Sequence, residues 1–280
     1  MRRISASEIE EAARKLVHAT FSNLSVLEER YKLALRLEES ELGREALSIL
    51  LENARIAGER GIPVCQDTGV AVFYVRLGQE VVVEGGGLVE AINRGVAKAY
   101  SEAYLRKSIV SDPLYDRRNT GDNTPAIIHV EPIPGSELRM GFMPKGAGAE
   151  NMSRVEMLKP ADGLEGLKRF VLEAVEKAGA NACPPLVIGI GVGGTLDTVG
   201  WLAKKALFRE WGERSSDERY AKLEEELLEE VNALGIGPQG FGGRITALDV
   251  RIEHAPCHMA SLPAAVNLNC HVHRVGWISL

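Results

Sequence analysis

The stretch "IPVCQDTGVAVFYVRL", residues 62–77, separates two kinds of sequence. Before it, "REALSILLENARIAGER" (44–60) keeps the 3.6-residue period of a helix, and Ser7 with Glu10 and Ser25 with Glu28 match the capping box that begins helices. From Val70 onward, short apolar runs alternate with glycine and proline turns, which is typical of strands. The chain therefore changes from helical to mixed structure near residue 61.

The same patterns predict the later elements. Strands are expected at residues 70–77, 126–133, 137–143 and 244–255, and helices at 88–104, 162–178, 197–209 and 215–233. The fold class is therefore mixed α/β (α+β), with a mixed β-sheet and flanking helices. We expect one domain over residues 1–280, composed of a helical N-terminal region (1–60) and a mixed region (61–280).

The composition is that of a soluble globular protein. The 280 residues are 45% hydrophobic and 26% charged, with a net charge of −6 and acidic and basic residues intermixed. This balance disfavours nucleic acid as a partner. No apolar run approaches the roughly 20 residues that span a bilayer, and the amino terminus turns amphipathic and acidic, unlike a secretory signal. We expect a cytoplasmic protein without a membrane partner.

A glycine-rich segment offers one alternative function. "VIGIGVGGT" (187–195) contains GxGxxG at Gly189, Gly191 and Gly194, the pattern of a dinucleotide-binding turn. Such a unit needs a second strand ending in an acidic residue about 20 residues on, whereas residues 204–220 look helical and charged. Close approach of another backbone, or positive φ, explains these glycines better.

The four cysteines are dispersed and form no CxxC pair, so free thiols are the simplest interpretation. The segment 253–274 is rich in cysteine and histidine but lacks the spacing of a structural zinc module. If the chain stays extended after Pro63, Cys65 and Asp67 point the same way; the alternative is a buried cysteine before an Asp-Thr-Gly turn. Lys145, among small residues in "MPKGAGAENMSR" (143–154), could face an anion or be a solvated surface lysine.

Five motifs occur in a specific order: "PVCQDTG", "NTGDNTPA", "MPKGAGAENMS", "ACPPLVIGIGVGGT" with "WLAKKALF", and "GGRITALDV" with "HMASLPAAVNLNCH". Together they resemble the α subunits of the iron–sulfur-dependent class I fumarate hydratases and L-tartrate dehydratases, from about residue 20 to the end. The resemblance implies the fold of an iron–sulfur hydro-lyase α subunit. It makes an electron-transfer protein a weaker alternative, because such proteins usually use four cysteine ligands.

The resemblance also implies a 4Fe-4S cluster and a set of site residues. Three positions match the cluster ligands, while Cys257 falls outside them; the matched metal ligands are Cys65, Cys183 and Cys270. For substrate contacts the matched residues are Gln66, Arg106, Lys145, Gly146 and Gly148. Asp67 is expected to transfer a proton or to position the reacting water, with His258 as its helper.

The activity implied is hydration of fumarate to L-malate, a reaction of the citric acid cycle, with L-tartrate dehydration as the alternative. An iron without a protein ligand would act as a Lewis acid towards the substrate hydroxyl. Family members that work as one chain carry a second domain with further cationic contacts. The resemblance therefore implies a β subunit as partner, in an α2β2 assembly that acts on a small dicarboxylate.

Overall fold

The computed structural model describes all residues from Met1 to Leu280, which divide into two compact units. Unit 1 comprises Met1–Leu24, Ile56–Gly146 and Arg274–Leu280, and unit 2 comprises Ser25–Arg55 and Ala147–His273. The chain thus passes from one unit to the other at four points, after residues 24, 55, 146 and 273. Each unit is assembled from segments that are distant in sequence.

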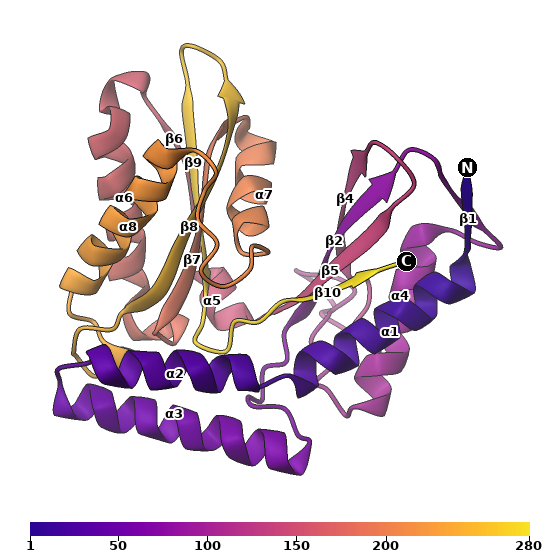
Figure 1. The fold of residues 1–280 in the computed structure, drawn as a ribbon, viewed down its shortest axis with the longest axis horizontal. Coiled ribbons are helices and arrows are strands. Elements are labelled where there is room, and N and C mark those ends of the chain that lie inside the picture. Colours follow the sequence, from indigo (N-terminus) through magenta and orange to yellow (C-terminus); the bar gives the residue numbers. More distant parts are fainter. The chain divides into compact units, whose positions relative to one another are not determined.

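Unit 1 is built on a four-stranded sheet of order β10-β5-β2-β4 (Figure 1). Its elements are β1 (Arg2–Ser5), α1 (Ala6–Ser22), β2 (Val70–Gly78), β3 (Val81–Glu84), α4 (Leu88–Glu102), β4 (Ile127–Ile133), β5 (Leu138–Lys145) and β10 (Gly276–Ser279). β2 runs antiparallel to β5 and parallel to β4, and β1 forms a separate parallel pair with β3. Ile9 of α1 and Ile92 of α4 are fully buried in one core with Phe73 and Phe142 of the sheet.

Unit 2 contains the second four-stranded sheet, of order β6-β9-β7-β8. Its elements are α2 (Ser25–Leu37), most of α3 (Glu41–Arg60), α5 (Ala147–Asn151), β6 (Arg154–Leu158), α6 (Gly163–Ala178), β7 (Leu186–Gly194), α7 (Leu196–Ala206), α8 (Glu218–Ala233), β8 (Ala247–Cys257) and β9 (Leu262–Asn269). Short 3-10 helices lie at Pro160–Asp162, Gly179–Ala182 and Pro238–Gly240. β7 pairs with β8 in parallel and with β9 in antiparallel orientation.

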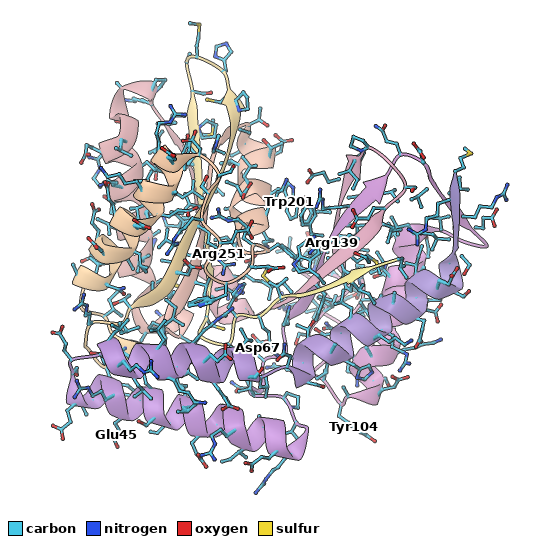
Figure 2. All side chains as sticks on the ribbon, in the orientation of Figure 1. Glu45, Asp67, Tyr104, Arg139, Trp201 and Arg251 are labelled. Carbon is cyan, nitrogen blue, oxygen red and sulfur yellow. The ribbon has the colours of Figure 1, made fainter.

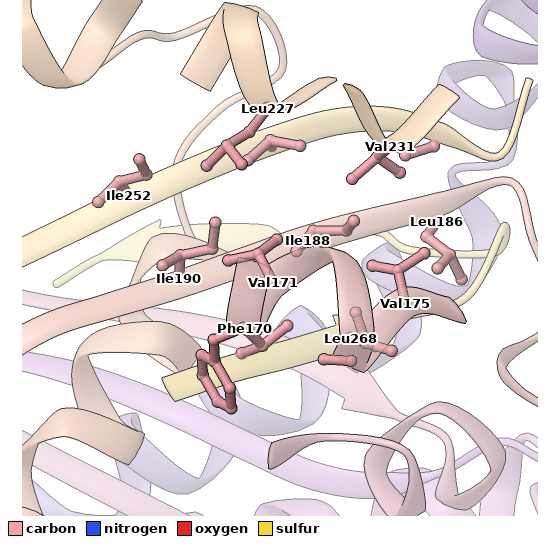
Figure 3. Packing of buried hydrophobic residues seen from close by; sticks show 14 of the residues in the cluster. Phe170, Val171, Val175, Leu186, Ile188, Ile190, Leu227, Val231, Ile252 and Leu268 are labelled. Carbon is pink, nitrogen blue, oxygen red and sulfur yellow. The ribbon is translucent and has the colours of Figure 1, made fainter. Parts of the chain in front are cut away.

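One face of this second sheet carries α6 and α8, and α7 covers the other face (Figure 1). Figure 3 shows the packing on the first face: Phe170, Val171 and Val175 of α6, Leu227 and Val231 of α8, Leu186, Ile188 and Ile190 of β7, Ile252 of β8 and Leu268 of β9. On the face that α7 covers, β7 has glycines at positions 189 and 191. A Cβ on Gly189 would lie 2.1 Å from the Ala203 carbonyl oxygen, and one on Gly191 would lie 2.3 Å from that of Val199.

This close packing explains the glycine-rich segment. Glycines at alternate positions of β7 let the backbone of α7 lie directly against the strand. The next strand, β8, begins only at Ala247, far beyond the spacing that a dinucleotide-binding unit requires. The GxGxxG pattern is therefore explained by helix packing.

The periodic segments formed the elements that the sequence predicts, but the amino terminus differs from expectation. Residues 2–5 form strand β1, and the capping box that begins α1 is Ser5 with Glu8, in place of Ser7 with Glu10. Strand β1 depends on its pairing with β3, about 80 residues away, and such pairing leaves no local pattern. None of the helices combines the length and apolar composition that a membrane-spanning segment requires.

Candidate functional site

The segment that precedes β2 is a compact turn and does not continue as an extended strand. Residues 64–66 form a bend, in which the Asp67 N–H donates to Cys65 Sγ at 3.4 Å. The Cys65 thiol donates to the Gln66 side-chain oxygen at 3.3 Å, and the Gly69 N–H donates to Asp67 Oδ1 at 3.0 Å. The same-face argument for Cys65 and Asp67 is therefore wrong. The two residues are instead coupled through the thiol and a backbone N–H, and Asp67 forms an Asx turn before β2. The Asp67 side chain is labelled in Figure 2.

Gly69 places this turn against the end of β5. Its φ of +76° favours glycine, and a Cβ there would lie 2.7 Å from the Lys145 backbone nitrogen. Lys145 itself is only 2% exposed, so the interpretation as a solvated surface lysine is wrong. On the following residue, a Cβ on Gly146 would lie 3.3 Å from Asp67 Oδ2. Unit 1 thus brings Asp67, Lys145 and Gly146 together.

Arg106 is attached to the same turn through Thr68. The buried Thr68 hydroxyl accepts the Arg106 N–H at 2.9 Å and donates to the Arg106 carbonyl at 3.3 Å. The Arg106 side chain is exposed, and its guanidinium can therefore reach a ligand in solution. Four residues of unit 1 that the resemblance assigns to substrate contacts border the turn around Asp67: Gln66, Arg106, Lys145 and Gly146.

Two further buried residues hold the turn in place. Asn123 donates from Nδ2 to the Gly69 carbonyl at 3.2 Å and accepts the Ser108 N–H at 2.7 Å. The Tyr100 hydroxyl contacts the carbonyls of Thr68 and Gly69, each at 3.2 Å. Burial raises the pKa of Tyr100 well above its ordinary value, so the hydroxyl keeps its proton. These contacts explain the second motif, "NTGDNTPA", as a structural support for the first.

Unit 2 brings together Cys183 and Cys270. Cys183 precedes β7 and Cys270 follows β9, which is antiparallel to β7, so both lie at the same end of the sheet. The His271 N–H donates to the Cys183 carbonyl at 3.1 Å. Cys183 is exposed and has a positive φ of 54°, while Cys270 is partly buried and both are free thiols.

The glycine-rich loop 143–154 contributes to both units. Gly146 ends unit 1, whereas in unit 2 a Cβ on Gly148 would lie 3.3 Å from the Asn181 carbonyl oxygen, two residues before Cys183. Glu150 of α5 forms an ion pair with Lys204 of α7 and accepts from Asn267 Nδ2 of β9 at 2.9 Å. The loop is therefore fixed beside Cys183 by charged and polar contacts to α7 and β9.

Comparison with known proteins identifies the family. The chain matches the sequence profile described as "Fumarate hydratase (Fumerase)" over residues 9–279. It belongs to the class I fumarate hydratase and tartrate dehydratase α family. A relative in Methanocaldococcus jannaschii, provisionally named L(+)-tartrate dehydratase subunit alpha, is 46% identical over 254 residues, 89% of this chain and 88% of the relative. The L(+)-tartrate dehydratase subunit alpha of Escherichia coli K12 is 33% identical over 243 residues, 85% of this chain and 79% of the relative.

The donor chemistry fits the iron–sulfur cluster that this family implies. Three thiols at the matched positions are free of disulfides, and two of them lie at one end of the sheet in unit 2. Nowhere in the chain are three His, Cys, Asp or Glu side chains grouped so that they could hold one metal ion. Of the three matched positions, Cys65 belongs to unit 1, and Cys183 and Cys270 belong to unit 2.

His258 lies far from this cysteine pair. It sits in the loop between β8 and β9, at the opposite end of the sheet from Cys183 and Cys270 (Figure 1). The length of β9, Leu262–Asn269, alone separates the two ends by roughly 24 Å. The loop is exposed, and His258 Nδ1 accepts the Ala260 N–H at 3.1 Å, which fixes the ring. Within one chain the structure does not bring His258 to Cys183 and Cys270.

Proposed function

We propose that this chain is the α subunit of a hydro-lyase that removes water from a 2-hydroxy dicarboxylate, with L(+)-tartrate as the first candidate substrate. The names of both curated relatives favour tartrate over fumarate, which the sequence had placed first. The observation that carries the proposal is the group around Asp67. Its carboxylate lies beside Gly146, the Lys145 backbone packs against Gly69, and Arg106 is hydrogen-bonded to Thr68.

Dehydration requires loss of hydroxide from one carbon and of a proton from the next. A 4Fe-4S cluster held by Cys65, Cys183 and Cys270 would supply a Lewis acid for the departing hydroxyl. Asp67 is proposed to move the proton, because its Oδ1 is fixed by the Gly69 N–H while the side chain stays half-buried.

The neighbouring groups are suited to binding carboxylates. Arg106 offers a planar guanidinium, which binds a carboxylate through two parallel hydrogen bonds. The buried Lys145 adds a second positive charge, Gln66 adds an amide, and Gly146 and Gly148 leave their backbone open to a ligand. These residues are proposed to hold the substrate, which carries two negative charges, next to the acid–base residue Asp67.

We further propose a β subunit as the partner, in an α2β2 assembly. The relatives are themselves named as α subunits. Leaving either substrate carboxylate without a cation in a dry site would cost several kcal/mol, and the group in unit 1 offers only Arg106 and Lys145. The remaining cations are proposed to come from the β subunit.

His258 retains its proposed role only if two α chains meet. Since it lies roughly 24 Å or more from Cys183 and Cys270 of its own chain, we propose that it acts at the site of a second copy. An α2β2 assembly supplies that second copy. The ring in the loop between β8 and β9, whose Nδ1 accepts the Ala260 N–H, would then present Nε2 to the substrate of the partner.

The test is co-expression of the chain with its β subunit, anaerobic purification, and parallel assays of L(+)-tartrate dehydration and fumarate hydration. Turnover of L(+)-tartrate at least ten times faster than of fumarate supports the proposal. Preference for fumarate would favour the second candidate, a fumarate hydratase, which the description of the matching family profile supports. No turnover of either diacid by the assembled protein would refute both functions.

Cysteine variants test the ligand assignment separately. Cys183→Ser is expected to lose most of the iron and the visible absorbance of the cluster. Cys257→Ser is the matched control, because Cys257 lies at the far end of the sheet with His258 and should keep full iron content. Normal iron content in Cys183→Ser would refute the assignment.

A further inference from the structure

Helix α2 contacts His271 and His273, which follow Cys270 in the chain. Tyr31 is fully buried, and its hydroxyl lies 2.7 Å from His271 Nδ1 and 3.2 Å from the His271 carbonyl oxygen. The preceding residue, Arg30, donates from Nη1 to the His273 carbonyl at 2.6 Å. Two adjacent residues of α2 therefore fix two alternate residues of this segment.

These contacts reach both cysteines of unit 2. His271, which Tyr31 holds by its ring and its carbonyl, directly follows Cys270 and donates its N–H to the Cys183 carbonyl at 3.1 Å. The His273 N–H donates to the Cys270 carbonyl at 3.0 Å, and the Cys270 N–H donates to Asn269 Oδ1 at 3.1 Å. A continuous set of hydrogen bonds thus runs from Tyr31 through His271 to Cys183.

On the helix side of this arrangement, Arg30 is held by contacts beyond its hydrogen bond to His273. The Arg30 guanidinium lies 4.3 Å from the centre of the Trp211 ring. Burial, and then the nearby Arg251, lower the pKa of Arg30 to about 10, so it remains charged at neutral pH. A charged donor forms a strong hydrogen bond to a carbonyl, here that of His273.

Cys183 needs such support because of its backbone. A φ of 54° with ψ of 67° is a left-handed conformation that residues with a side chain rarely adopt. It persists only where the surroundings determine it. The His271 N–H on the Cys183 carbonyl is one of the contacts that hold it.

We propose that Tyr31 is a positioning residue: through His271 it holds Cys183 and Cys270 as a preset pair of thiols before any cluster is assembled. The inference deepens the proposed function, since it assumes that these two thiols are cluster ligands. The proposal means that the two thiols of the apo chain already lie close enough to bind one small thiophilic centre. Less conformational freedom is then lost when the cluster binds.

The first experiment tests this pair without a cluster, a β subunit or a substrate. In a Cys65→Ser, Cys257→Ser background, only Cys183 and Cys270 remain. Phenylarsine oxide joins two nearby thiols through one arsenic atom with release of water, and its dissociation constant reports how well the pair is preset. We expect tight binding by this background, and binding about ten times weaker after Tyr31→Phe, which removes only the hydroxyl.

The second experiment uses the cluster-loaded protein and follows iron release to a chelator without oxygen. Tyr31→Phe is expected to release iron about ten times faster than the parent. Tyr74→Phe is the matched control, because Tyr74 is also buried but its hydroxyl donates to Glu131 in unit 1. If Tyr31→Phe does not fold, His271→Phe breaks the same hydrogen bond from the other side.

The outcomes separate positioning from a general structural role. Unchanged arsenical binding and iron release in Tyr31→Phe, with only a lower melting temperature of the apo chain, would overturn the proposal. Weak arsenical binding by the background itself would also overturn it, because the pair would not be preset. The arsenical result is independent of enzyme activity, so failure of the proposed function and failure of this inference can be told apart.

Discussion

Replacement of Glu38 by glutamine should destabilise unit 2 strongly, and the magnitude follows from its contacts. Glu38 is fully buried at the end of α2. Its Oε1 accepts the N–H groups of Glu39 at 2.8 Å, Ser40 at 2.9 Å and Arg244 at 2.9 Å, and its Oε2 accepts that of Ile245 at 2.8 Å. The carboxylate therefore connects the α2–α3 turn to the segment before β8.

In Glu38→Gln, one acceptor becomes an NH2 group. If the amide oxygen keeps the three bonds of Oε1, the Ile245 N–H faces a donor and stays unsatisfied, which costs about 1 to 3 kcal/mol. The other three bonds change from a charged to a neutral acceptor, at roughly 0.5 to 1 kcal/mol each. We expect the free energy of unfolding to fall by about 2.5 to 6 kcal/mol at pH 7, measured by urea denaturation.

The pH dependence provides a second measurement. Burial alone would raise the pKa of Glu38, but the N–H groups of Ile245, Ser40, Arg244 and Glu39 outweigh it and lower the pKa below the ordinary value of 4.5. Because the folded-state pKa is depressed, this stabilisation is present above about pH 4.5 and is lost as the pH falls through the folded-state pKa. The difference between parent and variant should therefore shrink below that range.

Glu39→Gln is the matched control for Glu38→Gln. The Glu39 side chain is 73% exposed and pairs with Arg244 Nη1 at 2.9 Å on the surface, so its loss should cost less than about 1 kcal/mol. A cost for Glu38→Gln as small as that of the control, or a difference from the parent that does not change between pH 7 and pH 3, would refute the argument.

Three other predictions concern the site and its support. Asp67→Asn should lower turnover by about 10²-fold with the cluster absorbance retained, and near-normal turnover would assign Asp67 to the turn alone. If His258 acts on a second copy, mixing Asp67→Asn chains with His258→Gln chains should restore about a quarter of parental activity. Random pairing makes half of the dimers mixed, and each mixed dimer has one of its two sites intact. No recovery on mixing would contradict action on a second copy. Gly69→Ala should destabilise unit 1 by roughly 2 to 4 kcal/mol, because φ is +76° and the Lys145 backbone lies 2.7 Å from the added Cβ. The control is Gly58→Ala in α3, where the added Cβ meets open space, and its melting temperature should be unchanged or slightly higher.

The sequence predicted the elements that carry a strong local pattern. Helices α4 and α6 and strands β2 and β5 lie within two residues of their expected bounds, because their apolar periodicity agrees with the faces that they bury. Strand β9 was missed: its "LPAAV" start contains proline and alanines, which are depleted in strands, and only its position between β6 and β7 makes it a strand.

The site could be predicted only as a set of residues. Motif order named Asp67, Arg106 and Lys145, but not the burial of Lys145, which depends on tertiary packing. Tyr31 and Asn123 were missed as supports because their partners lie 240 and 54 residues away in sequence. A single sequence contains no local signal for such pairs.

The four passages of the chain between the two units have a consequence for synthesis. The sheet of unit 1 is completed by β10, Gly276–Ser279, which pairs with β5 and follows every segment of unit 2 in the chain. The edge strand of unit 1 is therefore synthesised only after the whole of unit 2, although most of unit 1 precedes Ala147. Unit 2 needs no segment beyond His273 and can fold first. Cys183 and Cys270 can therefore reach their places in unit 2 before the sheet that follows Cys65 in unit 1 is complete.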